Sequence, residues 1–259
     1  MNESKLKADK INKSANKGNS VIVKNLSLTA ASFIQELEKL SDEKARKDLE
    51  RYFKPKHRDH FIGVKNSVVN KLAGNFLDMP IKELEKMLNN DIHEVRAGAI
   101  SVMDQLSRKK RTPAERRKEL FDLFMKKTDR VNNWDLTDLG CMYMTGCYLF
   151  DKDRKVLYNL VKSENFWERR IAIVSTSYFI RQNDTADTFK ISALLINDKE
   201  DLVQKGTGWM LRSAGDKNPA ALRKFLDKYA ATMPRTTLRY SLEKFSAKEK
   251  AYYMSLKKT

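Results

Sequence analysis

The sequence has little cysteine or histidine and none of the common motifs that bind metals or nucleotides. Cys141 and Cys147 lie in one apolar segment, and the histidines His57, His60 and His93 lie elsewhere, so neither set has zinc-ligand spacing. Two lone thiols are typical of a reducing compartment, where they pack as small hydrophobic side chains. Glycine-rich nucleotide loops and the metalloprotease helix motif are missing too. We therefore expect chemistry that uses neither a metal ion nor a nucleotide cofactor.

Long apolar runs are also missing. No stretch of the chain approaches the ~18 apolar residues that a membrane-spanning helix needs. The N-terminus is positively charged, but no apolar segment follows it, so it does not have the pattern of a secretory signal. We expect a cytoplasmic protein that has no membrane partner.

Acidic residues are the minority charge. The chain has 51 Lys and Arg against 34 Asp and Glu, which gives a formal net charge of +17. Such a surplus exceeds what solubility requires and predicts a polyanionic partner, most typically nucleic acid. Ribosomal, tRNA-binding and membrane-surface proteins share this property, and a solvated lysine-rich surface is the alternative that needs no partner. Lysine is frequent in residues 1–27, which we interpret as a basic arm or as a tail without a role.

Proline and glycine are scarce, at five and nine residues, and alternating strand patterns of useful length are absent. Thr29 can cap a first helix. The apolar residues that then recur at helical spacing begin with Phe33, Ile34, Leu37 and Leu40. With 41% hydrophobic residues the chain can bury one sizeable core. These features predict a single all-α domain over residues 28–259.

Three segments share a pattern in which a charged residue is followed by small residues. They are residues 94–100, 167–173 and 202–208. If Val95, Glu168 and Val203 are equivalent, the separations are 168 − 95 = 73 and 203 − 168 = 35 residues, roughly two repeats and one repeat of ~36. We then expect a further copy near residue 131 and a degenerate copy near residue 238.

A period near ~36 residues is typical of HEAT-like helix pairs, because small residues let the second helix of each pair pack closely against its neighbours. Such pairs stack into a right-handed superhelical solenoid of the ARM/HEAT type. Its concave side would form a basic groove that can follow a rod-shaped ligand. A helical bundle without true repeats is the alternative.

Trp134 and Asp138 are four residues apart, so a helix presents their indole and carboxylate on one face. Taken alone, such a pair more often consists of a core tryptophan and a helix-capping aspartate. Two further pairs with a spacing of three support a shared site: they are Trp167 with Arg170 and Trp209 with Arg212. We interpret Trp167 as a core residue. Arg169 points about 100° away from Arg170, so only one of these two arginines can face the groove.

A groove with indoles, a carboxylate and arginines suits an N-alkylated purine nucleoside. This nucleoside is cationic, and cleavage of its N-glycosidic bond develops positive charge on the sugar. A fixed carboxylate stabilises that charge and can orient water, while each aromatic face attracts the cation by ~0.5–2 kcal/mol. Arginines would hold the flanking phosphates.

The chain resembles a known family. Residues 132–138, 166–172 and 203–212 are similar to three signature stretches of AlkD-type DNA glycosylases. Residues 51–54 and 233–240 resemble further stretches, and the similarity covers roughly residues 30 to 250. The chain departs from the pattern in the N-terminal repeat: residues 65–70 lack an expected proline and arginine, and residues 54–60 are longer and more basic than in relatives.

The resemblance implies a role for individual residues. Asp138 matches the catalytic carboxylate, Trp134 and Trp209 match the two aromatics that flank the lesion nucleotide, and Tyr52 matches a further aromatic. The residues implied to contact the DNA backbone are Arg170, Arg212, Lys205 and Arg239.

The activity implied is that of a monofunctional DNA-3-methyladenine/7-methylguanine glycosylase. It would hydrolyse the N-glycosidic bond of cationic N3- or N7-alkylated purines in double-stranded DNA, as a monomer, without cofactors, in the bacterial cytoplasm and on the nucleoid. Two other functions stay open on the sequence: a non-catalytic binder of damaged or branched nucleic acid on the same solenoid, and a HEAT-type protein scaffold.

Overall fold

The computed structural model describes residues 26–53 and 59–256, and every regular element in these ranges is a helix. A single parallel β-bridge between His60 and Ile92 is the only strand-like pairing recorded there. The predicted all-α class is therefore confirmed. The expected basic arm, apart from residues 26 and 27, lies outside the described residues, as does most of the basic segment 54–60.

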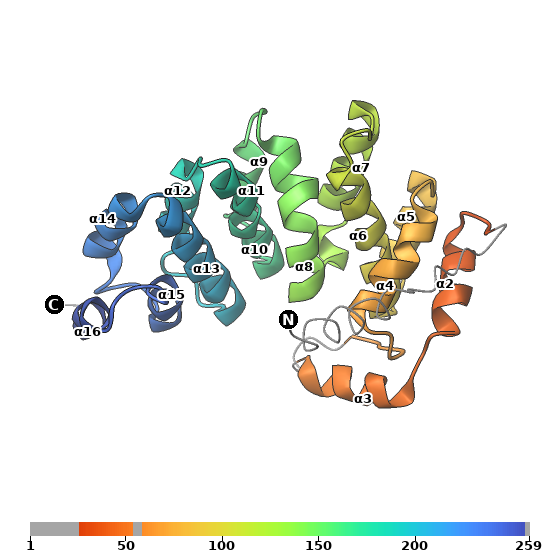
Figure 1. Cartoon of the computed structure of the whole chain (residues 1–259), viewed down its shortest axis with the longest axis horizontal. Helices are drawn as coiled ribbons and strands as arrows, with labels where there is room; N and C mark the ends of the chain where they lie inside the picture. The colour runs from red at the N-terminus through yellow and green to blue at the C-terminus, as the bar shows by residue number, and fades with distance from the viewer. Residues whose placement is uncertain (1–25, 54–58, 257–259) are drawn as a thin grey trace, which may run out of the picture.

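One row of helices runs through the length of the molecule, and we call it the inner row. Each of its helices packs against the next. The inner row consists of α4 (Asn66–Ala73), α6 (His93–Arg108), α8 (Trp134–Gly140), α10 (Phe166–Val174), α13 (Asp201–Lys217) and α15 (Arg235–Ser241). Figure 1 shows these helices following one another along an arc from the N-terminal to the C-terminal side.

A second row lies along the outer side of this arc (Figure 1). Each of its helices packs against a member of the inner row. The second row consists of α5 (Ile81–Leu88), α7 (Ala114–Lys126), α9 (Lys155–Leu160), α12 (Ala186–Leu194) and α14 (Pro219–Tyr229). The remaining α-helices are α2 (Ala30–Glu38), α3 (Glu43–Tyr52), α11 (Thr176–Arg181) and α16 (Ala247–Ser255). The short elements are η2 (Gly74–Phe76), η3 (Thr128–Arg130) and η4 (Cys141–Cys147), a π-helical continuation of α8.

A recurring contact marks equivalent positions in three helices of the inner row. Arg96, Arg169 and Gln204 each donate a side-chain N–H to the backbone carbonyl six residues earlier, at 2.8, 2.9 and 2.8 Å. Their separations are 169 − 96 = 73 and 204 − 169 = 35 residues, the same as those expected from the sequence pattern. Helices also occur where further copies were expected, with α8 beginning at Trp134 and α15 containing Leu238.

The first helix forms as expected at its start and differs at its end. The Thr29 hydroxyl caps α2 by accepting from the Ser32 N–H at 3.2 Å, and Phe33 and Leu37 are fully buried. The helical spacing was expected to include Leu40, which is instead 45% exposed. The reason is that α2 ends at Glu38, and turn hydrogen bonds at residues 40 and 41 redirect the chain.

Trp167 and Cys141 are buried, as the sequence suggested. Trp167 is 5% exposed and packs in the core, as predicted. Cys141 is buried and Cys147 is half-buried, both as free thiols. Within the described ranges, none of the helices combines the length and the apolar character needed to cross a membrane.

Candidate active site

A hollow of about 460 Å³ lies against the inner row and gathers side chains from five helices. The predicted site residues that line it are Tyr52 from α3, Trp134 and Asp138 from α8, Arg170 from α10, and Lys205, Trp209 and Arg212 from α13. Arg239 is the predicted site residue that does not line this hollow, and it is exposed on α15. Its neighbour Tyr240, which the sequence did not single out, lines the hollow instead.

Asp138 and Arg170 form a two-pronged ion pair inside the hollow. Arg170 Nε donates to Asp138 Oδ1 at 2.9 Å, and Arg170 Nη2 donates to Asp138 Oδ2 at 2.8 Å. The Asp138 side chain is 22% exposed and the Arg170 side chain only 6%. The pair therefore holds the carboxylate in one orientation with part of its surface open to the hollow.

The protonation of Asp138 is set by opposing influences. Burial raises the pKa of the Asp138 carboxyl, and the negative charge of Asp135 acts in the same direction. The charge and the hydrogen bonds of Arg170 oppose both. Arg170 is therefore the group that favours the ionised form of this partly buried carboxylate.

Arg170 is itself fixed by the next helix along the inner row. One Nη1 N–H donates to the backbone carbonyl of Leu202 at the start of α13. A Cβ atom on Gly206 would lie only 3.0 Å from Arg170 Nη1. Glycine at this position thus leaves room for the guanidinium, a reason beyond the close helix packing inferred from the sequence pattern.

The first turn of α8 orients Trp134 toward the hollow. Asn133 caps the helix by accepting from the Trp134 N–H at 2.9 Å. The Trp134 ring stacks on Phe53, with centroids 5.9 Å apart and planes 25° apart, and meets Tyr52 edge-on at 6.0 Å. Phe53 in turn stacks on Phe61 at 5.0 Å. Tyr52 is 69% exposed, so it forms the open edge of this aromatic group.

The other cationic residues of the hollow are more accessible than Arg170. Lys205 pairs with Asp201 at 2.8 Å and its side chain is 35% exposed. Arg212 pairs with Glu243, and its side chain is 22% exposed. Arg169, by contrast, points away and binds Asp198, with Nε 2.6 Å from Oδ2. Helix geometry predicted that only one of the two neighbouring arginines can face the hollow, and that one is Arg170.

Phe53, Asn133 and Tyr240 line the hollow but were missed by the sequence reasoning. Phe53 lies within residues 51–54 and Asn133 within residues 132–138, two segments that had been singled out as motifs. Their roles depend on packing and capping. A phenylalanine that acts through packing has no recognisable pattern in a sequence. Asparagine is a preferred N-cap residue, so only the capping role of Asn133 could have been anticipated.

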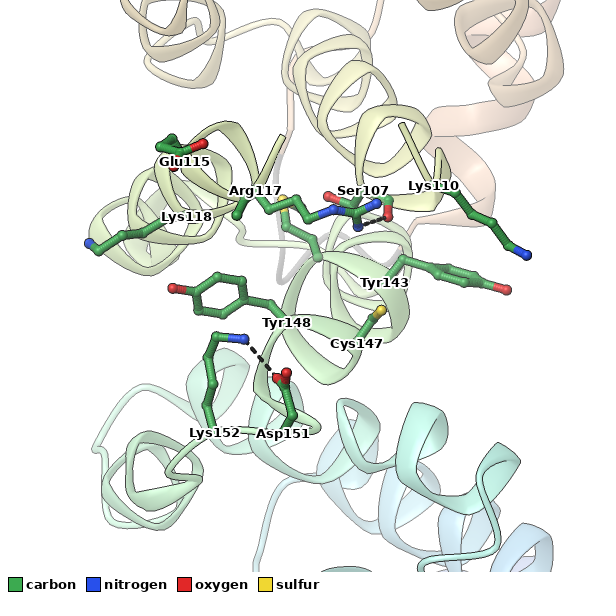
Figure 2. Close-up of a pocket in the computed structure, with 12 residues that line it drawn as sticks. Ser107, Lys110, Glu115, Arg117, Lys118, Tyr143, Cys147, Tyr148, Asp151 and Lys152 are labelled. Atoms are coloured by element: carbon green, nitrogen blue, oxygen red, sulfur yellow. Dashed lines mark hydrogen bonds and ion pairs between the residues drawn. The ribbon is translucent and has the colours of Figure 1, made fainter. Parts of the chain in front are cut away.

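A larger hollow, of about 590 Å³, lies between α7 and η4 and contains no predicted site residue. Figure 2 shows Tyr143, Cys147 and Tyr148 along one side and Arg117 and Lys118 on the other. Several of its charged groups are engaged locally: Lys152 pairs with Asp151 at 2.7 Å, and Arg117 donates to the Ser107 carbonyl. In the ranges that the structure covers, no group of three or more His, Cys, Asp or Glu is placed to hold a metal ion.

The fold and the site together define a class: an all-helical protein with a carboxylate–arginine pair, two indoles and further cations in one hollow. Residues 33–245 match the model of the DNA alkylation repair enzyme family, and the chain belongs to this family. Membership indicates an enzyme of DNA repair with DNA as its partner.

Among solved structures, the chain is similar to a predicted DNA alkylation repair enzyme from Enterococcus faecalis. The TM-score is 0.62 at 18% identity, over 80% of this chain and 97% of that chain. This likeness shows a shared fold. A comparison with curated proteins found no match.

Proposed function

We propose that the protein is a monofunctional DNA glycosylase that hydrolyses the N-glycosidic bond of cationic N3- or N7-alkylated purines in double-stranded DNA. One observation carries the proposal. The Asp138 carboxylate is held by Arg170 and partly open within a hollow that Trp134 and Trp209 also line.

The reaction follows from the chemistry of the substrate. The bond between sugar C1′ and the purine nitrogen breaks, and its electron pair neutralises the cationic base, which leaves without needing a proton. Positive charge then develops on the sugar, where the ionised Asp138 stabilises it. Water adds to C1′, and we assign Asp138 as the group that accepts its proton.

The aromatic residues supply attraction for the cationic nucleotide. Trp134, Trp209 and Tyr52 line the same hollow as Asp138. An indole face within reach of a cationic purine contributes about 0.5–2 kcal/mol. Because the stack of Trp134 on Phe53 fixes one of these faces in advance, binding costs less ordering of side chains.

Arg170 was expected to contact the DNA backbone, and its surroundings favour a different main role. Its guanidinium is engaged by Asp138 and by the Leu202 carbonyl, and little of the side chain is exposed. We propose that Arg170 positions Asp138 and keeps it ionised. The more exposed Lys205, Arg212 and Arg239 are then the candidates for phosphate contacts.

We further propose that the two rows of helices form a right-handed HEAT-like solenoid with a basic groove along the inner row, where the duplex lies. The arc in Figure 1 and the repeated separations of 73 and 35 residues support this arrangement. Since the hollow is built from one chain, a monomer suffices. The DNA partner makes the nucleoid of the bacterial cytoplasm the expected location.

The test is the release of free base from a duplex with N7-methylguanine or N3-methyladenine. We expect Asp138→Asn to lower the rate at saturating enzyme by about a hundredfold or more. The matched control is Asp122→Asn, which changes an exposed aspartate of α7 paired with Lys118. Equal release by wild type and Asp138→Asn would remove Asp138 from the mechanism. Tight binding of damaged duplex without release by any variant would favour the non-catalytic binder.

A further inference from the structure

His93 is a buried histidine that the proposed reaction does not use. It is the first residue of α6, and its side chain is 1% exposed. Its Nδ1 lies 2.7 Å from Asp59 Oδ2, and its Nε2 lies 2.9 Å from Asp135 Oδ2. Ionised carboxylates only accept hydrogen bonds, so both ring nitrogens act as donors and the ring is an imidazolium. Burial disfavours this charge, but Asp135 and Asp59 outweigh it and raise the pKa of His93 to about 9.

His93, Asp59 and Asp135 form an ion network. Through Asp59, this network holds the segment before α4 against α6. Asp59 also accepts from Arg96 and, at 3.1 Å, from Asn133 Nδ2. The neighbouring Glu94 carboxylate accepts from the backbone N–H groups of residues 62, 63 and 64. Gly63 makes this possible, because its φ of +89° lies in the left-handed region. The first turn of α6 and residues 59–64 thus form one unit.

The other end of the network reaches the first turn of α8. Asp135 follows Trp134 directly and precedes Asp138 by three residues, on a neighbouring part of the same helix surface. Phe53 contacts both sides of the junction, at 5.3 Å from the His93 ring and 5.9 Å from the Trp134 ring. His93 therefore touches the support of the indole and the acidic neighbour of the carboxylate.

We propose that His93 is a positioning residue: held between Asp59 and Asp135, its imidazolium fixes the first turn of α8 under Trp134 and balances the Asp135 charge that would otherwise repel Asp138. The role in base release rests on the proposed function. The electrostatic coupling between His93, Asp135 and Asp138 does not.

Other charged and titratable groups face this chain of contacts from each neighbouring element. Around His93 they are Asp59, Glu94, Arg96 and Asp135, and around Asp138 they are Tyr52, Asp135, Cys141, Arg170, Lys205, Arg212 and Tyr240. Arg170 is the group bonded directly to Asp138, so it stays unchanged in every variant of the test.

The experiment follows the side-chain carboxyl carbon of Asp138 by NMR during a pH titration of the full chain. The variants are His93→Gln, Asp135→Asn and the double variant. If the proposal holds, removal of the imidazolium raises the pKa of Asp138 by at least about half a unit, and removal of the Asp135 charge lowers the pKa of Asp138 by a similar amount. The double variant should fall between these two, and His60→Gln, which removes an exposed histidine, should match wild type.

Base release gives the second readout. The release rate should fall on acidification as Asp138 gains its proton. The pH of this fall should be higher than in wild type for His93→Gln and lower for Asp135→Asn. An Asp138 titration that is the same within about 0.2 units in wild type and Asp135→Asn would overturn the coupling, even if His93→Gln does not fold. If wild type releases no base while the Asp138 pKa values of the variants follow the expected order, the proposed function fails and the coupling stands. A merely structural His93 would lower stability without this ordered change in pKa.

Discussion

Two arginines that are neighbours in the sequence make similar bonds in very different places. Arg169 binds Asp198, and Arg170 binds Asp138, each through Nε and one Nη nitrogen. Asp198 is 4% exposed and ties the loop before α13 to α10, whereas Asp138 is 22% exposed and faces a hollow with indoles. An ion pair alone therefore does not mark a site. Partial exposure of the carboxylate beside aromatic and cationic groups does.

Arg169 has a counterpart in the N-terminal repeat, and Arg170 has none there. Arg96 occupies the position 73 residues before Arg169, and both donate to the carbonyl six residues earlier, whereas the position 73 residues before Arg170 is Ala97. Each of the two arginines also binds a buried aspartate, Arg96 a preceding one and Arg169 a following one, so this recurring arginine is expected to hold the repeats together. Arg170 lines the hollow and binds Asp138, so it is expected to act in the reaction.

The largest effect should be on stability, from Arg169→Ala. This substitution leaves the buried Asp198 carboxylate without its cation, which costs about 3–5 kcal/mol. Arg170→Ala should cost less, because Asp138 is better solvated. Urea unfolding of both variants measures the difference. A greater loss of stability in Arg170→Ala would contradict the assignment of Arg169 as the structural partner.

Asp59 binds both Arg96 and His93, and the stability that this N-terminal cluster contributes should depend on pH, unlike that of the Arg169 pair. His93 has a pKa raised from 6.5 to about 9, so its stabilising contribution is complete below pH 6.5 and is lost as the pH rises through about 9. The expected loss in unfolding free energy is at most about 3.5 kcal/mol. His93→Gln should remove this part of the pH profile. The Arg169 pair gives none there, since a guanidinium does not titrate below about pH 12. A wild-type profile that is flat from pH 6.5 to 9 would contradict the charged state of His93.

The next effect is on catalysis, from Arg170→Gln. Loss of the two-pronged bond lets the Asp138 carboxylate turn from its orientation and raises its pKa further. We expect base release to fall by about a hundredfold per folded molecule. Arg169→Gln is the matched control and should stay within about twofold of wild type once folded protein is counted. Similar rates for the two variants would erase the distinction between the pairs.

The smallest effect should come from Gly206→Ala. The added methyl group crowds Arg170 Nη1 at 3.0 Å and shifts the guanidinium by a few tenths of an ångström. We expect a loss of about two- to fivefold in base release. Gly74→Ala is the control, because a Cβ there would make only an ordinary contact, 3.5 Å from Gln105 Oε1. An unchanged rate in Gly206→Ala would show that the position of Arg170 tolerates this crowding.

The sequence was informative wherever local geometry decides the outcome. Helical spacing placed Trp134 beside Asp138 and separated Arg169 from Arg170, and the structure agrees on both points. Spacing could not identify the partners of His93, which lie 34 and 42 residues away and meet it through tertiary packing. For the same reason the histidine seemed isolated when only zinc-ligand spacing was considered.

Single-residue register was the other limit. The motif around Arg239 and Tyr240 was found, but the position of Tyr240 in the hollow was not; Arg239 lies outside the hollow, and its contact with the DNA backbone stays a prediction. One residue corresponds to about 100° on a helix, so an error of one position changes which side chain faces a site. Leu40 failed in a similar way, because the end of α2 depends on a turn that apolar periodicity does not reveal.

The most direct test of the account compares two titrations of the wild-type protein. One is the pH dependence of base release from an N7-methylguanine duplex in a single turnover, corrected for spontaneous loss, and the other is the NMR titration of the Asp138 carboxyl. We predict that the fall of the rate at acidic pH coincides with the titration of Asp138, and that Asp138→Asn lacks this fall. A release rate that stays constant while Asp138 gains its proton would contradict it.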